Sequence, residues 1–216
     1  MIEEYFHIRD NCRNGLIKYL QEALSVLPVI KNPEILDIGC GTGVPALWLA
    51  GKYAGRITAI DIDRDSLGWL QKKIDEKILG DRITVLNLSF FDFKTQPDYY
   101  DLILSEGFLN VVGFKKGFQR AINILKKKGF FIIHDEFKDH PWKCNFIRDN
   151  GCGIIDTLFL DEQVWWNDYY KKLESAINDL ADIRLKSLFK MDLKELKQYK
   201  YDPSLFKSIY YIVEKL

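Results

Sequence analysis

The chain has 216 residues, and its 31 lysines and arginines balance its 31 aspartates and glutamates, so its formal net charge is zero. This length fits one domain with a full hydrophobic core, and the neutral balance argues against a polyanion-binding tail of the kind found in nucleic-acid-binding proteins. The acidic opening MIEEYFHIRDN lacks the layout of a signal peptide. No apolar run reaches the roughly 18–20 residues of a membrane span. We therefore expect a soluble, cytoplasmic protein with no membrane partner, and a homodimer stays open.

The hydrophobic pattern alternates between helical periods and apolar runs of strand length. An amphipathic segment from Leu16 to Leu27 comes first. The predicted strands after it are Ile35–Ile38, Ile57–Ile60, Ile83–Leu86, Leu102–Leu104 and Phe130–Ile133, and the predicted helices between them are Ala46–Tyr53, Ser66–Leu79 and Phe114–Lys127. This alternation predicts an α/β fold, namely a three-layer αβα, Rossmann-like, doubly wound domain with a mostly parallel sheet.

The last third of the chain departs from this alternation. CGIIDTLFL predicts another strand, residues 161–202 predict a charged helical insertion, and SIYYIVEKL predicts an antiparallel last strand. We expect a single domain in which residues 32–160 and 203–216 form the core and residues 1–31 form an N-terminal helical cap. Lysines 126–128 are expected to end a helix, where cations interact favourably with the helix dipole.

Cysteine spacing gives little evidence of a metal or redox site. Cys12, Cys40, Cys144 and Cys152 form no CxxC pair, so we expect free thiols that are mostly buried. Cys144 and Cys152 are an alternative pair of ligands for a soft metal or metalloid, although their separation does not match a known zinc motif. No metal site is predicted.

The stretch ILDIGCGTGVPALWLA carries the strongest functional signal. Glycines at alternate positions let the backbone turn sharply where a strand ends, which is where open parallel sheets bind their ligands. A dinucleotide fingerprint needs its third glycine at position 44, which is Val44, so the spacing argues against an NAD-linked oxidoreductase. Asp37, just before the turn, would repel a pyrophosphate and attract an ammonium group. We therefore expect a ligand that is cationic at this point.

These residues resemble the first motif of the class I S-adenosylmethionine-dependent methyltransferases, E/D-x-G-x-G-x-G, which DIGCGTG matches at every specified position. Asp61 ends the strand ITAID, where this family places the acid that holds the ribose hydroxyls. The resemblance covers residues 33–135. It implies S-adenosyl-L-methionine as the cofactor and S-adenosyl-L-homocysteine as the product. The cofactor contacts that it implies are Asp37, Gly39, Cys40, Gly41, Gly43, Asp61, Ile62, Ser89, Phe90, Ser105 and Glu106.

Two later motifs match the family less completely. In VLNLSFFDF, Ser89 occupies the place where relatives often carry an adenine-contacting aspartate, and Asp92 is the alternative if the register differs. Phe90 either stacks on adenine or packs in the core. The fourth strand leads into SEGFLNVVG instead of the [D/N/S]-P-P-[Y/F/W] of enzymes that methylate exocyclic amines or glutamine, and resembles a small-molecule subset. Glu106 then faces the cofactor or the substrate, or else caps the following helix.

Catalytic and substrate residues are expected at the same edge of the sheet. His134 follows the strand FFII, and its imidazole could accept a proton from the substrate; the alternative is a hydrogen-bonded structural histidine. Glu106 is the other catalytic candidate. The aromatic cluster VWWNDYY and the N-terminal segment are expected to close the substrate pocket, with plain packing as the alternative. The substrate-pocket candidates are Tyr5, Phe6, Trp165, Trp166 and Tyr169.

Together these patterns predict a methyltransferase that acts on a small molecule by direct in-line displacement. The alternatives are a methyltransferase acting on RNA or protein and a cofactor-binding protein without catalysis. The neutral charge and the missing proline motif argue against a nucleic-acid partner. No motif identifies the methyl acceptor.

Overall fold

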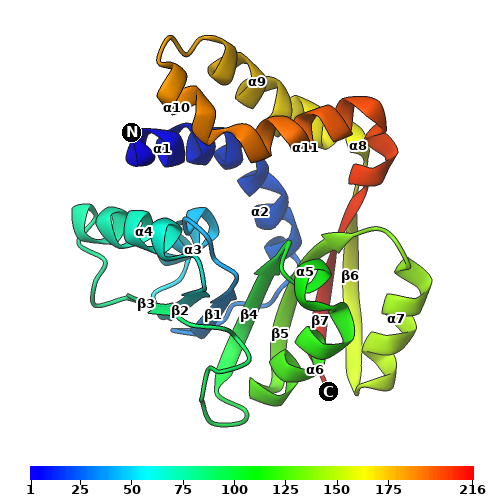
Figure 1. The fold of residues 1–216 in the computed structure, drawn as a ribbon. Helices are drawn as coiled ribbons and strands as arrows, with labels where there is room; N and C mark the ends of the chain where they lie inside the picture. The colour runs from blue at the N-terminus through cyan, green and yellow to red at the C-terminus, as the bar shows by residue number, and fades with distance from the viewer.

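The computed structural model describes residues 1–216 and shows a seven-stranded sheet between two layers of helices, with a helical cap at one end (Figure 1). The strand order is β3-β2-β1-β4-β5-β7-β6, and β7 runs antiparallel to both of its neighbours. The strands are β1 Glu34–Ile38, β2 Arg56–Asp61, β3 Ile83–Asn87, β4 Tyr100–Glu106, β5 Leu125–Glu136, β6 Cys152–Leu160 and β7 Ser208–Lys215. The predicted αβα fold with an antiparallel last strand is confirmed.

The two layers of helices cover opposite faces of the sheet. One layer holds α2 (Ile17–Ser25), α3 (Val44–Lys52) and α4 (Arg64–Glu76), and the other holds α5 (Leu109–Val112), α6 (Phe114–Ile124) and α7 (His140–Asp149). Successive strand residues point to alternate faces, so Ile35 packs in the first core and Leu36 in the second. The sequence pattern did not predict α7, because only Lys143 and Ile147 of this helix are buried.

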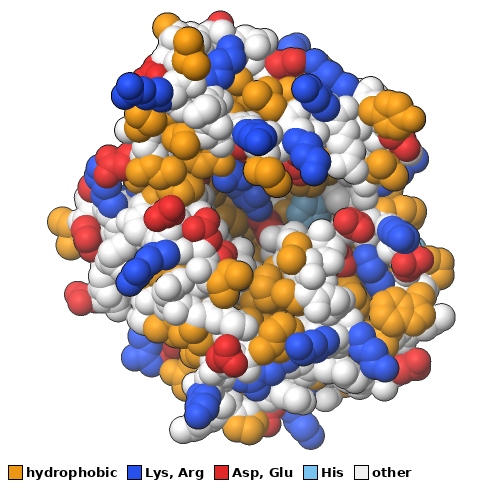
Figure 2. All heavy atoms as spheres, in the orientation of Figure 1, with side chains coloured by type: hydrophobic (Ala, Val, Ile, Leu, Met, Phe, Trp, Pro, Cys, Tyr) orange, Lys and Arg blue, Asp and Glu red, His pale blue; other side chains and the backbone are white.

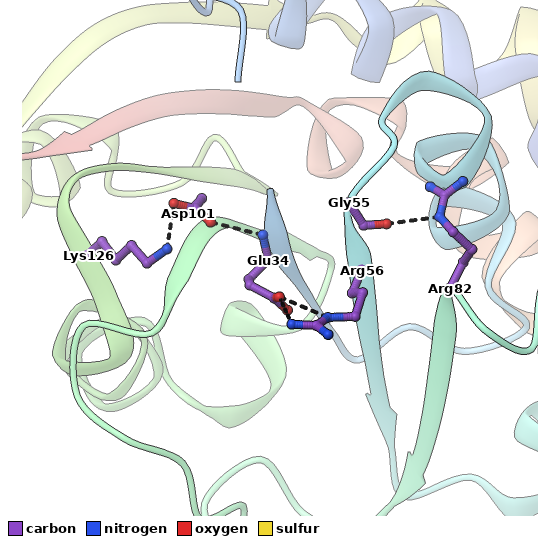
Figure 3. Close-up of polar contacts among 6 residues, drawn as sticks. All are labelled: Glu34, Gly55, Arg56, Arg82, Asp101 and Lys126. Carbon is purple, nitrogen blue, oxygen red and sulfur yellow. Dashed lines mark hydrogen bonds and ion pairs between the residues drawn. The ribbon is translucent and has the colours of Figure 1, made fainter. Parts of the chain in front are cut away.

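Polar contacts hold the amino ends of the strands together (Figure 3). Glu34, the first residue of β1, accepts a 2.9 Å hydrogen bond from Nε of Arg56. The backbone N–H of Glu34 donates to Asp101 of β4, also at 2.9 Å. Just before β3, Arg82 donates to the carbonyl of Gly55 at 3.0 Å. These contacts lie at the edge of the sheet opposite to the glycine motif, so they support the strand arrangement rather than a site.

Lysines 126–128 do not end a helix, and that prediction was wrong. The helix α6 ends before Leu125, whose extended backbone angles begin β5. Leu125 pairs with Tyr100 of β4, and Lys126 forms an ion pair with Asp101 at 2.8 Å (Figure 3). Strand pairing and this carboxylate therefore outweigh the helical pattern of the segment.

The cap combines the N-terminal helix with the helical segment between β6 and β7. These helices pack around an apolar core that is separate from the two cores of the sheet. The elements of the cap are α1 (Ile2–Arg13), the 3-10 turn η1 (Asn14–Leu16), α8 (Glu162–Trp165), the π-helical turn η2 (Trp166–Tyr170), α9 (Lys171–Asn178), α10 (Ile183–Leu188), α11 (Lys190–Tyr201) and the 3-10 turn η3 (Pro203–Phe206). Figure 1 shows α1 beside the late helices, above the sheet. Tyr5 donates to Asp192 at 3.1 Å, which fastens α1 to α11, and Lys18 of α2 pairs with Asp168 at 2.8 Å, which fastens the late helices to the sheet layer.

None of the helices has both the length and the apolar composition that a membrane crossing requires. All four cysteines are free thiols, as predicted. Cys12, Cys40 and Cys152 are buried, and Cys144 is half-buried with its sulfur 3.7 Å from the ring nitrogens of His140.

Candidate active site

Three adjoining cavities lie at the carboxyl ends of the central strands, beneath the cap. The loop cavity, of about 140 Å³, is lined by Arg9, Asp10, Arg13, Gly39, Cys40, Gly41, Thr42, Ser66, Glu106 and Tyr169. The side cavity, of about 270 Å³, is lined by Gly39, Ile60, Asp61, Ile62, Leu88, Ser89, Phe90, Phe91, Gly107, Phe108, Val111 and Val112. The cap cavity, of about 490 Å³, lies between Glu106, His134 and the cap helices. Gly39 lines the first two cavities and Glu106 lines the first and third, so the three cavities adjoin one another.

The glycine turn after β1 serves both the packing and the cavity. Gly39, Gly41 and Gly43 all have positive φ angles, of 69°, 52° and 74°, which side chains rarely adopt. A Cβ at Gly39 would lie 2.8 Å from the ring of Phe108, and one at Gly43 would lie 2.3 Å from Leu70. A Cβ at Gly41 would meet no protein atom within 4 Å. Gly41 therefore keeps the loop cavity open, while the other two glycines are required by the fold itself.

Asp37 is a buried carboxylate that lacks a hydrogen-bond donor. Its side chain lies at the end of β1, the residue is 2% exposed, and Oδ2 makes no hydrogen bond. Burial, together with the charge of Glu106, raises the pKa of Asp37 to about 8. An unpaired buried carboxylate is costly. An ammonium group placed beside it would supply the missing donor and the opposite charge.

Asp61 connects the end of β2 to the glycine turn. One carboxylate oxygen accepts the backbone N–H of Gly41 at 2.8 Å, and the other accepts that of Asp63 at 2.9 Å. The side chain is half-buried and lines the side cavity. Because each carboxylate oxygen can accept a second hydrogen bond, Asp61 remains able to bind a pair of hydroxyl groups.

Glu106 lies where the loop cavity meets the cap cavity. Tyr210 of β7 donates a 2.5 Å hydrogen bond to one of its oxygens, and Arg13 of α1 approaches the other at 3.5 Å. The side chain of Glu106 is 11% exposed. Glu106 therefore connects β4, the last strand and the cap rather than acting as a free surface acid.

His134 is enclosed by aromatic rings at the wall of the cap cavity. It stacks on Tyr210 with ring centroids 4.2 Å apart, and the ring of Trp165 lies parallel to it at 5.9 Å. Its Nε2 is 2.9 Å from the hydroxyl of Ser208. Burial lowers the pKa of His134 to about 4. The imidazole is therefore neutral at physiological pH and a weak proton acceptor.

Comparison with known proteins assigns this arrangement to a family. Residues 35–129 match a family model described as a methyltransferase domain. The fold is similar to that of the [4+2]-cyclase SpnF, with a TM-score of 0.78 and 15% identity, over 92% of this chain and 80% of that one. Residues 35–129 therefore form a domain of the class I S-adenosylmethionine-dependent methyltransferase type. S-adenosylmethionine is the cofactor of this family.

Two curated relatives show how far the similarity of this methyltransferase extends. It is 28% identical over 152 residues to the cyclopropane-fatty-acyl-phospholipid synthase of Escherichia coli (strain K12), covering 66% of this chain and 37% of that protein. It is 41% identical over 81 residues to the tRNA1(Val) (adenine(37)-N6)-methyltransferase of Flavobacterium johnsoniae, covering 36% of this chain and 34% of that protein. The methyltransferase thus spans about a third of the length of these relatives.

The cavities of this methyltransferase fit the parts of S-adenosylmethionine. The loop cavity, beside the unpaired Asp37, suits the amino-acid part, and Asp61 suits the ribose. The side cavity is mostly apolar and suits a flat base; Ser89 and the 2%-exposed Phe90 belong to its wall. Asp92 is exposed and does not line the side cavity. Of the two alternatives for the adenine contact, Ser89 and Asp92, only Ser89 therefore lies at the cavity wall.

Two of the predicted cofactor residues, Ser105 and Ile62, differ from the others in their exposure to the cavities. Ser105 is fully buried in β4, where it pairs with Ile38, and it lines none of the three cavities, which differs from its predicted role. Side chains alternate along a strand, so Glu106 reaches the cavity while its neighbour does not. Ile62 is 74% exposed at the mouth of the side cavity.

The structure divides the predicted substrate aromatics into two groups. Trp165 and Tyr169 line the cap cavity of the methyltransferase. Tyr5, Phe6 and Trp166 lie outside it, contrary to expectation. Phe6 stacks on Trp69, and Tyr5 packs against Phe189 in the cap. Trp166 stacks on Tyr199 with ring centroids 5.9 Å apart, and it opens the π-helical turn η2.

Asp10 is a functional candidate that the sequence patterns did not predict. This residue of α1 is 7% exposed, and its carboxylate accepts hydrogen bonds from Thr42 at 2.5 Å, Trp69 at 2.8 Å and Lys73 at 2.5 Å. Lys73 also donates to the carbonyl of Thr42 at 2.7 Å. An acid inside an amphipathic helix carries no sequence signal of its own, since most such residues face solvent. Only the folded chain shows that Asp10 holds the cap against the glycine turn.

Proposed function

We propose that this methyltransferase transfers a methyl group from S-adenosylmethionine to a small molecule bound in the cap cavity. The observation that carries the proposal is the position of Glu106, which lines both the loop cavity and the cap cavity. An acceptor in the cap cavity would therefore lie next to the amino-acid end of the cofactor. The reaction class follows from the family, and the acceptor site follows from the cavity.

The residues of this chain act by binding and positioning. When bound, S-adenosylmethionine supplies a methyl group on a positively charged sulfur. Asp61 and Ser89 would hold the nucleoside, and Asp37 would hold the ammonium group. Holding two reactants in line supplies roughly 7–11 kcal/mol of barrier reduction in well-oriented reactions, which exceeds the usual contribution of a general base. The cap, fastened to the glycine turn through Asp10, would cover the bound reactants.

The size and enclosure of the cap cavity favour a small acceptor. Its volume of about 490 Å³ is in the range of small-molecule sites. Figure 2 shows a hollow below the cap rather than an extended groove. Two larger hollows, of about 560 and 810 Å³, contain none of the predicted site residues.

We assign no base role to His134 in this proposal. Its lowered pKa, its stacking on Tyr210 and its contact with Ser208 support a structural role in the cavity wall. Glu106 accepts a hydrogen bond from Tyr210 and is approached by Arg13. Its role would be an electrostatic interaction with charged groups of the bound cofactor and acceptor.

A tRNA or protein acceptor is the competing function. The relative from Flavobacterium johnsoniae is by name a tRNA methyltransferase, and its similarity to this chain is confined to 81 residues. The cap helices of this chain lie outside the residues that match the family model. The family match therefore does not decide between the acceptors.

The test has two stages. Calorimetry should show binding of S-adenosylhomocysteine by the wild type and a loss of at least tenfold in Asp61→Ala. Labelled S-adenosylmethionine is then incubated with the protein and, in parallel, with a deproteinised metabolite extract, total tRNA and a protein extract. The ultrafiltrate of the metabolite reaction is separated by chromatography, and a new labelled compound that is distinct from S-adenosylmethionine and absent without the protein supports the proposal. Label retained with tRNA or protein, and none in the metabolites, contradicts it.

A further inference from the structure

Three of the four acidic groups that line the cap cavity already have partners in the protein. Glu106 accepts the 2.5 Å hydrogen bond of Tyr210, and Asp135 is paired with the buried Lys143 at 2.8 Å. Glu136, the next residue of β5, is 3.4 Å from the amide of Asn110. Three of the four carboxylates that line the cavity thus contact a donor of the protein, and the fourth, Glu195, is exposed to solvent.

The basic groups of the same cavity are much less engaged. Arg13 makes one contact, with Glu106 at 3.5 Å, and Lys207 makes one, with Glu162 at 3.7 Å. Arg9 uses its Nε for Asp192 at 3.0 Å. A guanidinium carries five N–H donors and an ammonium three, so these side chains keep most of their donor capacity.

Exposure of these cations is intermediate, which suits ligand binding. The side chain of Arg13 is 39% exposed and that of Lys207 is 41% exposed, so neither is buried in a fixed internal ion pair. Figure 2 shows basic side chains around the upper part of the hollow below the cap. Trp165 and Phe206 line the same cavity and offer apolar surface beside the cations.

We propose that the methyl acceptor is an acidic small molecule whose carboxylate is bound by the cationic donors of the cap cavity, Arg13 and Lys207. The inference rests on the proposed function, because it names the substrate class of that site. A guanidinium binds a carboxylate in a planar, two-point geometry, and such charge-assisted hydrogen bonds are stronger than neutral ones. The apolar wall then contacts the rest of the acceptor.

The experiment measures binding of benzoate and benzamide to the protein saturated with S-adenosylhomocysteine. The two probes share a shape and differ in charge. Benzoate should bind at least tenfold more tightly than benzamide. Arg13→Met and Lys207→Met should each weaken benzoate by roughly tenfold or more and leave benzamide unchanged, as expected for the loss of a charge-assisted hydrogen bond. Arg13→Lys should restore part of the affinity, and Lys197→Met, an exposed lysine of α11, is the matched control.

The outcomes separate this inference from the proposed function. If the wild type does not bind S-adenosylhomocysteine, the proposed function fails. If it does, equal binding of the two probes, no benzoate binding, or unchanged benzoate affinity in both variants overturns the acidic acceptor. A further arm compares S-adenosylhomocysteine with methylthioadenosine, which lacks the amino-acid part. Arg13→Met could weaken the binding of S-adenosylhomocysteine but leave the binding of methylthioadenosine and of benzoate unchanged. In that case Arg13 binds the carboxylate of the cofactor, and the inference is overturned.

Discussion

The hydroxyl of Thr42 donates a 2.5 Å hydrogen bond to the carboxylate of Asp10, and this contact joins the cap to the glycine turn. Trp69 and Lys73 of α4 donate to the same carboxylate, so three elements meet at one buried acid. The cap is therefore connected to the glycine turn and to α4 through direct hydrogen bonds. Residues that lie outside the family match thus support the central motif of the family.

Asp10→Ala is expected to weaken both stability and cofactor binding. The change leaves Lys73 without its partner, and breaking a largely buried ion pair typically costs about 2–4 kcal/mol. Urea unfolding measures the stability, and calorimetry with S-adenosylhomocysteine should show an affinity loss of at least tenfold. Lys72→Met is the control, because Lys72 joins the same two helices through an exposed pair with Glu3. Equal effects of the two changes would contradict a special role for Asp10.

Asp37→Asn is expected to stabilise the ligand-free protein and weaken cofactor binding. The pKa of Asp37 is raised from 3.8 to about 8 in the folded chain, so the unfolded chain binds fewer protons across this range. Its ionisation therefore costs stability increasingly as pH rises from about 4 to 8, by up to about 5 kcal/mol.

Urea unfolding of the wild type and of Asp37→Asn at several pH values measures this cost. The difference in stability should favour the variant and should grow with pH up to about 8. The variant should also lose affinity for S-adenosylhomocysteine, because an amide cannot neutralise an ammonium group. A stability difference that is independent of pH would show that the folded pKa of Asp37 is normal.

The three glycines should separate into two classes. Gly43→Ala places a Cβ 2.3 Å from Leu70 and should destabilise the fold by roughly 2 kcal/mol or more. Gly41→Ala meets no protein atom, so its stability cost is limited to the left-handed backbone, roughly 1–2 kcal/mol. Because Gly41 lines the loop cavity, the added methyl group is expected to reduce the room for the cofactor, and S-adenosylhomocysteine should bind at least tenfold more weakly. A Gly41→Ala protein with unchanged affinity would show that the cofactor does not occupy this cavity.

His134 should titrate far below an ordinary histidine. Its pKa is lowered from 6.5 to about 4, so the unfolded chain binds more protons between these values. The contribution of His134 to stability is therefore complete above pH 6.5 and is lost as pH falls toward 4. NMR titration of the imidazole carbons measures the pKa directly, and His134→Asn should reduce the acid sensitivity of unfolding. An NMR pKa between 6 and 7 would return His134 to the list of candidate bases.

Local patterns were sufficient where a structural element depends on its own residues. The strands follow from apolar runs that fill both faces of a parallel sheet, and the glycine turn follows from alternate glycines after an acid. The segment at Leu125 was misassigned because its helical pattern competes with pairing to Tyr100, which comes from a distant part of the chain. Trp166 was misplaced for a similar reason, since it stacks on Tyr199, which lies more than thirty residues further along the chain.

The sequence by itself determined the αβα fold, the cofactor loop and Asp37, because these depend on periodicity and on spacing over a few residues. Only the tertiary structure decided that Asp10 and Arg13 reach the site, that Ser105 does not, and that the cap encloses a cavity. The physical reason is that these properties belong to contacts between segments far apart in the chain. A helix pattern shows which residues share a face, but the element against which that face packs is chosen by the whole fold.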